Sequence, residues 1–167
     1  MSAADALFQL GMDLAPGSST AQTEAQDHDP HGDAPHEERP LDERKDYFVE
    51  RNGARYAGTH LLIDLWGAER LDDIEFVRRT LVDCVEAAGA SLLHIHLHHF
   101  TPNQGVSGVA VLAESHISIH SWPETGYAAL DVFMCGGAEP HKAVEVLRQN
   151  FKPATVSVEE VMRGPQR

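Results

Sequence analysis

Hydrophobic and polar residues alternate with a period of two in several segments of the chain, which is the pattern of β-strands with one buried face. In GTHLLIDLWG, for example, Leu61, Ile63 and Leu65 alternate with His, Leu and Asp. In GYAALDVFMCG, the alternation separates Ala, Leu, Val and Met from Tyr, Asp, Phe and Cys. The pattern predicts strands over residues 58–67, 91–100, 106–114, 114–124, 126–136 and 154–164.

Two longer segments repeat hydrophobic residues every three or four positions, which predicts helices. The first covers residues 71–89, with Asp72 or Asp73 as its N-cap. The second covers residues 139–151, with Pro140 in its first turn. Because four strands lie between only two helices, the order predicts an α+β fold. We expect a single core domain in which an antiparallel β-sheet carries both helices on one face.

Residues 1–57 differ in composition from the rest of the chain. They hold 12 acidic and 5 basic residues, are rich in Pro, Ser and Gln, and contain few large hydrophobic residues. Such a segment cannot bury enough apolar surface to offset the entropy of ordering it. We therefore expect an acidic, largely disordered N-terminal extension over 1–57, with one short helical piece in ADALFQLGMDL, and a folded domain over 58–167.

The charge of the whole chain limits its possible partners. Its 26 acidic and 13 basic residues give a formal net charge of −13. Nucleic acid and anionic membranes are not expected partners, because both need clustered Lys and Arg. The two cysteines, Cys84 and Cys135, have no CxxC spacing, and neither a signal peptide nor a membrane span is recognisable. We expect a cytoplasmic protein that acts on a small molecule.

Histidines alternate along one predicted strand. His94, His96 and His98 share a face of SLLHIHLHHF, and zinc sites can use histidines in this way. No local Cys or carboxylate completes a set of ligands, so a polar sheet face that lines a cleft or an interface is the preferred interpretation. The histidines of the N-terminal extension are interpreted as part of a solvated acidic linker. No metal site is predicted.

The segment ESHISIHSWPE, residues 114–124, concentrates reactive polar groups in a strand-like pattern. A hydrolase triad of Ser115, His120 and Asp131 is one interpretation, because a serine nucleophile needs a base and an orienting acid. No GxSxG turn surrounds the serine, however. A regular strand also places positions 115 and 120 on opposite faces, because their separation is odd. The triad is therefore disfavoured.

The segment GVSGVAVLAESHISIHSWPETGYAALDVFMCG, residues 105–136, resembles the prokaryotic-type S-adenosylmethionine decarboxylase proenzymes, a pyruvoyl-dependent family. The motif joins GVSGV, ESH, IH, WPE, GYAA, D and CG at ordered spacings. The likeness extends more loosely over residues 58–164 and includes GTHLLIDLWG and the terminal RG. The acidic extension has no counterpart in the compact core of the family.

The resemblance implies that the chain cleaves itself. In this family a serine hydroxyl attacks the carbonyl of the preceding residue, and elimination of the resulting ester leaves a dehydroalanine. This residue takes up water and loses ammonia to become a pyruvoyl group, which condenses with the substrate amine. Carried onto this chain, the cleaved bond is Glu114–Ser115, and Ser115 becomes the pyruvoyl cofactor. His120 then matches the proton acceptor of processing, and Ser107 matches a residue that assists it. Cys135 matches the proton donor of decarboxylation.

The resemblance also implies a substrate site. Glu124 matches the carboxylate that grips ribose hydroxyls, and Phe100 and Trp122 match the aromatic pair near adenine, with ordinary packing as the alternative for both rings. We expect a homodimer of cleaved protomers that decarboxylates S-adenosylmethionine to the aminopropyl donor of spermidine biosynthesis. An extra residue in FTPNQGVSG and Met134, both expected on the substrate side, leave open an ornithine or arginine decarboxylase of the same family. An inactive regulatory partner of an active decarboxylase is the alternative from another class.

Overall fold

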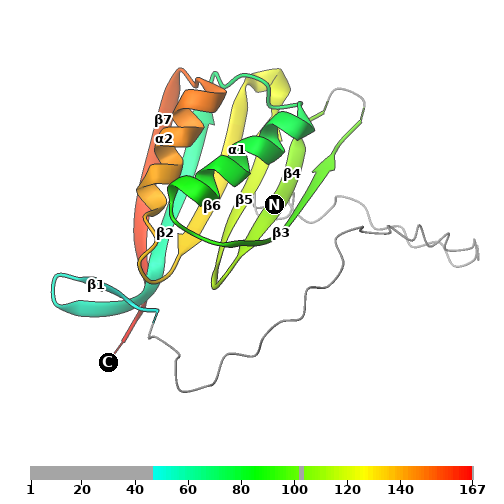
Figure 1. The fold of residues 1–167 in the computed structure, drawn as a ribbon. Coiled ribbons are helices and arrows are strands. Elements are labelled where there is room, and N and C mark those ends of the chain that lie inside the picture. The colour runs from blue at the N-terminus through cyan, green and yellow to red at the C-terminus, as the bar shows by residue number, and fades with distance from the viewer. Residues whose placement is uncertain (1–46, 102–103, 167) are drawn as a thin grey trace, which may run out of the picture. The chain divides into compact units, whose positions relative to one another are not determined.

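The computed structural model describes residues 47–101 and 104–166. These residues form a seven-stranded antiparallel sheet and two helices, and both helices lie on the same face of the sheet (Figure 1). The strands are β1 (Val49–Arg51), β2 (Ala54–Trp66), β3 (Leu92–His99), β4 (Val106–Leu112), β5 (Ser115–Trp122), β6 (Tyr127–Met134) and β7 (Thr155–Pro165). The helices are α1 (Ile74–Ala87) and α2 (Pro140–Phe151). The expected α+β architecture is confirmed.

Strand β2 organises the sheet, because it pairs with β7 along one edge and with β6 along the other. From β6 the order continues through β5 and β4 to β3, so that β3 forms one edge and β7 the other. Strand β1 pairs only with the first residues of β2. All of these pairings are antiparallel.

The hairpin of β1 and β2 corrects the expected boundary at residue 57. Its turn is formed by Asn52 and Gly53, whose φ angles of 52° and 77° both lie in the left-handed region. Asn-Gly with two positive φ angles is the signature of a type I′ hairpin turn, so the local sequence itself carries the signal for this element. The folded part therefore begins about ten residues earlier than expected. The rest of the expected extension, residues 1–46, lies outside the described residues.

The helix-covered face of the sheet contains the hydrophobic core. Leu61, Ile117, Ile119 and Val132 are completely buried there, and both helices pack their apolar stripes against them. Helix α1 begins where the Asp73 side chain accepts a hydrogen bond from the backbone N–H of Phe76 at 2.9 Å, which satisfies one of the free donors of the first turn. Of the two expected caps, Asp73 is the one that acts.

The opposite face of the sheet, which we call the open face, has no covering element among the described residues. Histidine, serine, aspartate and aromatic side chains from β2, β4, β5, β6 and β7 occupy it. Four large hydrophobic side chains on this face are between 36% and 42% exposed, namely Leu62, Trp66, Val111 and Trp122. So much exposed apolar surface on one face is typical of an interaction surface.

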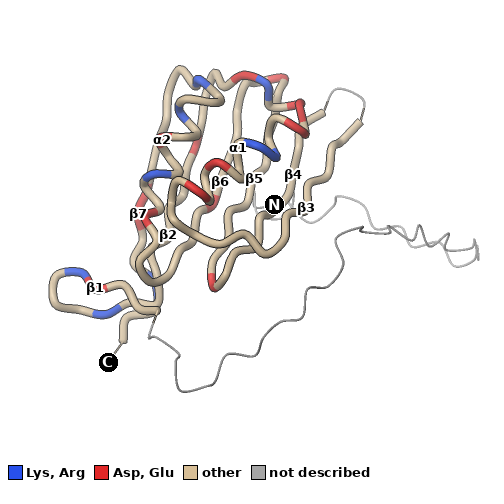
Figure 2. Tube along the Cα trace, in the orientation of Figure 1, with Lys and Arg blue, Asp and Glu red and all other residues tan. Residues whose placement is uncertain are grey.

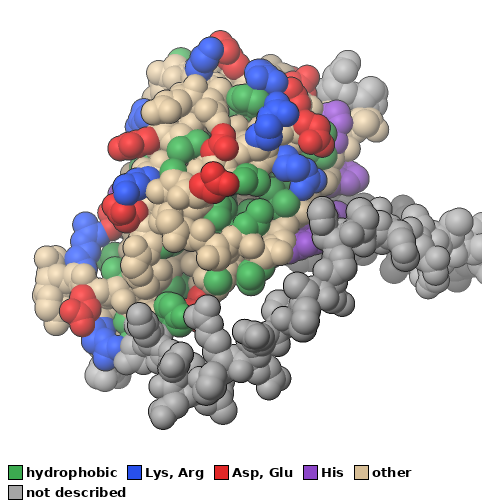
Figure 3. Space-filling model, in the orientation of Figure 1, with side chains coloured by type: hydrophobic (Ala, Val, Ile, Leu, Met, Phe, Trp, Pro, Cys, Tyr) green, Lys and Arg blue, Asp and Glu red, His purple; other side chains and the backbone are tan. Residues whose placement is uncertain are grey.

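Charged side chains are distributed differently from the exposed hydrophobic side chains of the open face. Figure 2 shows them on both helices and on the β1–β2 hairpin, whereas β4 and β5 carry none. The helix side viewed in Figure 3 shows charges over the helices and histidines along the edge formed by β3.

On β3, Leu97 is buried but Leu93 is 63% exposed, because β3 is an edge strand and its register shifts near Leu92. Within the described residues, neither helix is long and apolar enough to cross a membrane.

Candidate active site

Strands β4 and β5 are joined by a tight turn of two residues, Ala113 and Glu114, which is closed by the pair Leu112 and Ser115. Glu114 has a φ of 63°, in the left-handed region. A residue with a Cβ adopts this conformation at a cost of about 1–2 kcal/mol, so the surrounding hairpin must hold it there. The strained residue is the one that precedes Ser115, at the expected cleavage site.

Cys135 contacts both residues of the expected cleavage site. The backbone N–H of Cys135 donates to Ser115 Oγ at 3.2 Å, and Cys135 Sγ donates to the Glu114 carbonyl oxygen at 3.1 Å. The carbonyl that a Ser115 nucleophile would attack is thus polarised by a donor. Three of the expected site residues meet at this point.

The environment of Cys135 favours its neutral thiol. Partial burial and the nearby negative charge of Glu114 raise the pKa of this thiol above its ordinary value of 9.0, and the hydrogen bond with Ser115 opposes them only in part. Both causes disfavour the thiolate. Cys135 therefore keeps its proton at neutral pH, as a proton donor must.

A second cluster lies on the open face. Ser107 of β4 and His120 of β5 are directly paired in the sheet register, and Ser107 Oγ is 2.9 Å from His120 Nδ1. The imidazole is exposed, so its other ring nitrogen is available to a partner or a substrate. The two residues expected to assist processing are therefore in direct contact with one another.

The two clusters do not meet within one chain. Strand β5 is regular from Ser115 to Trp122, and five residues of extended chain separate Ser115 from His120 by about 16 Å. Their side chains also alternate to opposite faces. The hydrolase triad is not assembled either, because Asp131 accepts from Ser118 at 3.0 Å while His120 contacts Ser107.

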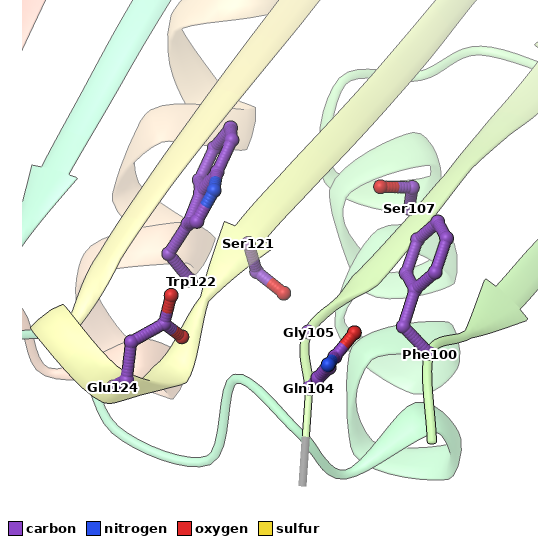
Figure 4. Close-up of a pocket in the computed structure, with 7 residues that line it drawn as sticks. All are labelled: Phe100, Gln104, Gly105, Ser107, Ser121, Trp122 and Glu124. Carbon is purple, nitrogen blue, oxygen red and sulfur yellow. The ribbon is translucent and has the colours of Figure 1, made fainter. Parts of the chain in front are cut away.

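A pocket of about 590 Å³ opens next to the second cluster (Figure 4). Figure 4 shows Trp122 and Glu124 on one side of it and Phe100 and Ser107 on the other. The pocket is lined by Phe100, Gln104, Gly105, Ser107, Ser121, Trp122 and Glu124. It brings together the three side chains expected to bind substrate, which come from the ends of β3 and β5 and from the 3₁₀ turn Pro123–Thr125.

The wall of this pocket depends on a close approach between β4 and β5. A side chain on Gly105 would collide with the carbonyl oxygen of Ser121, so only glycine fits there. The buried Ser121 hydroxyl accepts from the N–H of Val106 at 2.8 Å and lies 2.8 Å from the carbonyl oxygen of Leu71. The sequence analysis missed Ser121 and Gln104. The GVSG and HSWPE motifs mark the region, but the contact across β4 and β5 gives no local signal.

The aromatic wall of the pocket continues across the open face. The Trp122 ring stacks on Tyr127 with 5.3 Å between centroids, and Tyr127 lies 5.8 Å from Trp66. The Tyr127 hydroxyl donates to Asp64 Oδ1 at 2.5 Å. This bond and the Asp64 charge raise the pKa of Tyr127, because the carboxylate favours the protonated phenol.

Two other expectations concern histidines and Met134. Among the described residues, no group of three or more His, Cys, Asp or Glu side chains is arranged to hold a metal ion, so the alternating histidines of β3 form no such site.

Met134 was expected on the substrate side. It is instead almost completely buried on the helix-covered face, because it alternates with Phe133 along β6. Its identity is therefore no argument for another substrate.

Comparison with known proteins identifies the family of the chain. The model of the S-adenosylmethionine decarboxylase family matches residues 59–164. The chain belongs to this family of decarboxylases. The matched residues include both clusters, the strained turn and the pocket, and leave out the N-terminal residues.

Individual relatives match the same part of the chain. The S-adenosylmethionine decarboxylase proenzyme of Methanococcus maripaludis strain C7 is 49% identical over 110 residues, which are 64% of this chain and 89% of the relative. The proenzyme of Thermomicrobium roseum is 44% identical over 108 residues, 64% of this chain and 93% of the relative. The crystal structure of the Aquifex aeolicus VF5 adenosylmethionine decarboxylase is 33% identical with a TM-score of 0.61, and the match covers 67% of this chain and 94% of that one.

Proposed function

We propose that this chain is a cytoplasmic proenzyme that cuts itself between Glu114 and Ser115 and then decarboxylates S-adenosylmethionine with a pyruvoyl group derived from Ser115. The observation that carries the proposal is the arrangement at the β4–β5 turn. The Cys135 thiol donates to the carbonyl of Glu114, which is held at a φ of 63°, and the Cys135 backbone N–H donates to the Ser115 hydroxyl. Cleavage relieves this conformation, so the strain favours the reaction.

The residues around the turn have separate tasks in this proposal. Cys135 polarises the Glu114 carbonyl before cleavage, and afterwards its thiol supplies the proton that replaces the lost carboxylate. His120, oriented by Ser107, accepts the proton that must leave the serine Cα during elimination. The pyruvoyl group supplies a ketone that withdraws electrons from the carbon losing CO₂.

The pocket beside His120 supports a nucleoside substrate. Glu124 offers a carboxylate to the two hydroxyls of a ribose, and Phe100 and Trp122 offer ring faces to an adenine and to a sulfonium charge. Its volume of about 590 Å³ is in the range that binds small molecules. The product would be the aminopropyl donor for spermidine synthesis.

The separation of the two clusters supports a dimer. Because His120 lies about 16 Å along β5 from Ser115, one chain cannot bring its own base to its own cleavage site. A twofold axis near the middle of β5 would place the Ser115 end of one chain against the His120 end of the other. The exposed apolar side chains of the open face fit such a contact. Each complete site would then combine two protomers.

Intact-mass spectrometry tests self-cleavage. We expect two species, residues 1–114 and 115–167, with the second carrying a pyruvoyl group in place of its N-terminal serine. Ser115→Ala should yield one uncut chain, because no hydroxyl remains to attack the carbonyl. Ser118→Ala, on the same strand, should still be cut. A wild-type protein that stays whole after long incubation contradicts the proposal.

Mixing variants tests the composite site. A His120→Ala chain should stay uncut alone but be cut when it is co-expressed with a Ser115→Ala chain, which supplies the missing imidazole. The two chains are distinguished by mass tags. Failure of this rescue in a confirmed mixed dimer would show that His120 acts within its own chain.

The substrate is tested by CO₂ release from processed protein offered S-adenosylmethionine, ornithine and arginine in parallel. We expect release from S-adenosylmethionine alone, and Glu124→Ala should lower kcat/KM roughly 10- to 150-fold through the lost charged hydrogen bonds. Release only from a basic amino acid would identify the ornithine or arginine decarboxylase instead. Release from none, despite a formed pyruvoyl group, would favour a regulatory partner.

A further inference from the structure

A second pocket lies on the open face, at the end of the sheet that carries the cleavage site. Its volume is about 390 Å³, and it is lined by Ala57, His60, His116, Phe133, Arg163 and Gly164. The His60, His116 and Phe133 rings contact one another at centroid distances of 5.8 to 6.4 Å. His116 and the pair Arg163–Gly164 belong to the ESH and RG motifs of the sequence, but none of these residues has a task in the reaction described above.

The pocket adjoins the reacting atoms. His116 directly follows Ser115 and is paired with Phe133 in the sheet register. Phe133 is two residues before Cys135, about 7 Å along an extended chain, and β6 ends at Met134 between them. A proton donor and a departing carboxylate act on the same substrate carbon. The carboxylate must therefore lie close to Cys135, and two residues of this pocket, His116 and Phe133, are within two positions of Ser115 and Cys135 in the sequence.

Arg163 gives the pocket its positive charge. Its guanidinium Nη1 donates to His60 Nδ1 at 3.1 Å, and no carboxylate of the described residues lies within ion-pair distance of it. On the other side of the ring, His60 Nε2 lies 3.3 Å from Asp131 Oδ1 but forms no hydrogen bond among the described residues. Within the described part of the chain, one donor of the guanidinium is used, which leaves others to receive a planar anion.

We propose that this pocket is the subsite for the substrate α-carboxylate, with Arg163 as the residue that binds it and His60 as the residue that positions Arg163. The proposal rests on the proposed decarboxylase function, but not on the nucleoside, because every amino acid substrate carries this carboxylate. The guanidinium fork orients the group, and the apolar surfaces of Phe133 and Ala57 favour uncharged CO₂ over a charged carboxylate.

The test compares two ligands that differ only in the carboxylate, S-adenosylmethionine and its decarboxylated product. In processed Arg163→Met protein, kcat/KM for the substrate should fall about 10- to 100-fold, mainly through KM, while the inhibition constant of the product changes less than about twofold. The kcat/KM of Arg163→Lys should lie between those of wild type and Arg163→Met, because an ammonium keeps the positive charge but lacks the forked pair of donors. Arg79→Met, on helix α1, removes the same charge on the other side of the sheet and should behave as wild type.

The outcomes separate this subsite from the proposed function. If wild-type protein decarboxylates ornithine or arginine instead, the same comparison is made with that amino acid and its decarboxylated amine, and the same pattern is expected. Equal losses for substrate and product in Arg163→Met, or no loss for either, would overturn the subsite while the activity stands. A wild-type protein that decarboxylates none of the three would overturn both.

Discussion

The two faces of the sheet differ in what their side chains contact. On the helix-covered face, aliphatic residues such as Ile117 and Ile119 are buried in the core, and their side chains have no polar atoms that need a hydrogen-bond partner. On the open face, their neighbours in sequence make specific pairs, such as Ser107 with His120 and Tyr127 with Asp64. One face supplies stability through buried apolar area, and the other positions individual polar atoms.

Adjacent residues on β5 therefore have separate tasks. Ile119 is completely buried, whereas His120 is exposed and paired with Ser107. If stability and chemistry are divided between the faces, substitutions one position apart should fail in different assays. This division can be tested residue by residue.

The largest effect is expected for His120→Ala. Loss of a positioned base should slow self-cleavage by about 10²- to 10⁴-fold. Because the side chain is exposed, the free energy of unfolding should change by less than about 1 kcal/mol. Cleavage is followed by gel and mass, and stability by urea unfolding of an uncut Ser115→Ala background. A loss of unfolding free energy large enough to account for the slow cleavage would contradict the division of stability and chemistry between the two faces.

Cys135→Ser should separate cofactor formation from decarboxylation. We expect cleavage to continue, while CO₂ release falls by about 10²- to 10³-fold, because a hydroxyl is a much weaker acid than a thiol. Cys84→Ala is the control, since Cys84 is buried in the core and its thiol donates to the Ala143 carbonyl.

The pH dependence sharpens the assignment of Cys135. Its pKa is raised above 9.0, and the donor acts in its protonated form, so activity should hold through neutral pH and fall as pH rises through that pKa. After cleavage, the new carboxylate of Glu114 adds negative charge and acts in the same direction. An alkaline limb of kcat below pH 9 would contradict a thiol donor in this environment.

Ile119→Ala should have the opposite profile to its neighbour. Truncating a fully buried isoleucine costs about 2–5 kcal/mol of unfolding free energy. The fraction that remains folded should still cleave, because the Glu114 turn and the His120 pair are unchanged. Urea unfolding of the uncut background measures the loss. A stable Ile119→Ala protein would mean that the core relaxes to fill the cavity.

The smallest effect is expected for Tyr127→Phe. The ring keeps its stacking on Trp122, but the hydrogen bond to Asp64 is lost, which costs about 1–2 kcal/mol. Because Trp122 lines the pocket, KM should rise a few-fold while self-cleavage is unchanged. Tyr56→Phe, on the β1–β2 hairpin, serves as the matched control.

The covered face could be predicted from local sequence, because burial on one side of a strand leaves a period of two. The alternation in 126–136 and the cap at Asp73 are both found as expected. The hairpin at Asn52 and Gly53 also had a local signal, which was overlooked in the acidic composition around it. Propensity and turn chemistry act over a few residues, so they are readable without the fold.

The open face was less predictable. The motif resemblance named Ser107, His120 and the Phe100, Trp122 and Glu124 side chains of the pocket, but not the distance that separates them from Ser115. The contacts of His60 with Phe133 and of Asp64 with Tyr127 join residues more than 60 positions apart. Such contacts depend on which strands become neighbours and in which register, and local periodicity carries no information on either.

The order of the strands gives a cut at Glu114–Ser115 an unusual outcome. The piece before the cut contributes β2, β3 and β4, and the piece after it contributes β5, β6 and β7. Because β2 lies between β6 and β7, one piece is inserted into the other, and the two cannot separate without opening the sheet. An uncut proenzyme would fold as one chain, but a denatured cut molecule would have to reassemble from two, at a rate that depends on protein concentration. Cleavage would thus convert a unimolecular folding reaction into a bimolecular one, and a lost mature enzyme would be replaced by new synthesis more readily than by refolding.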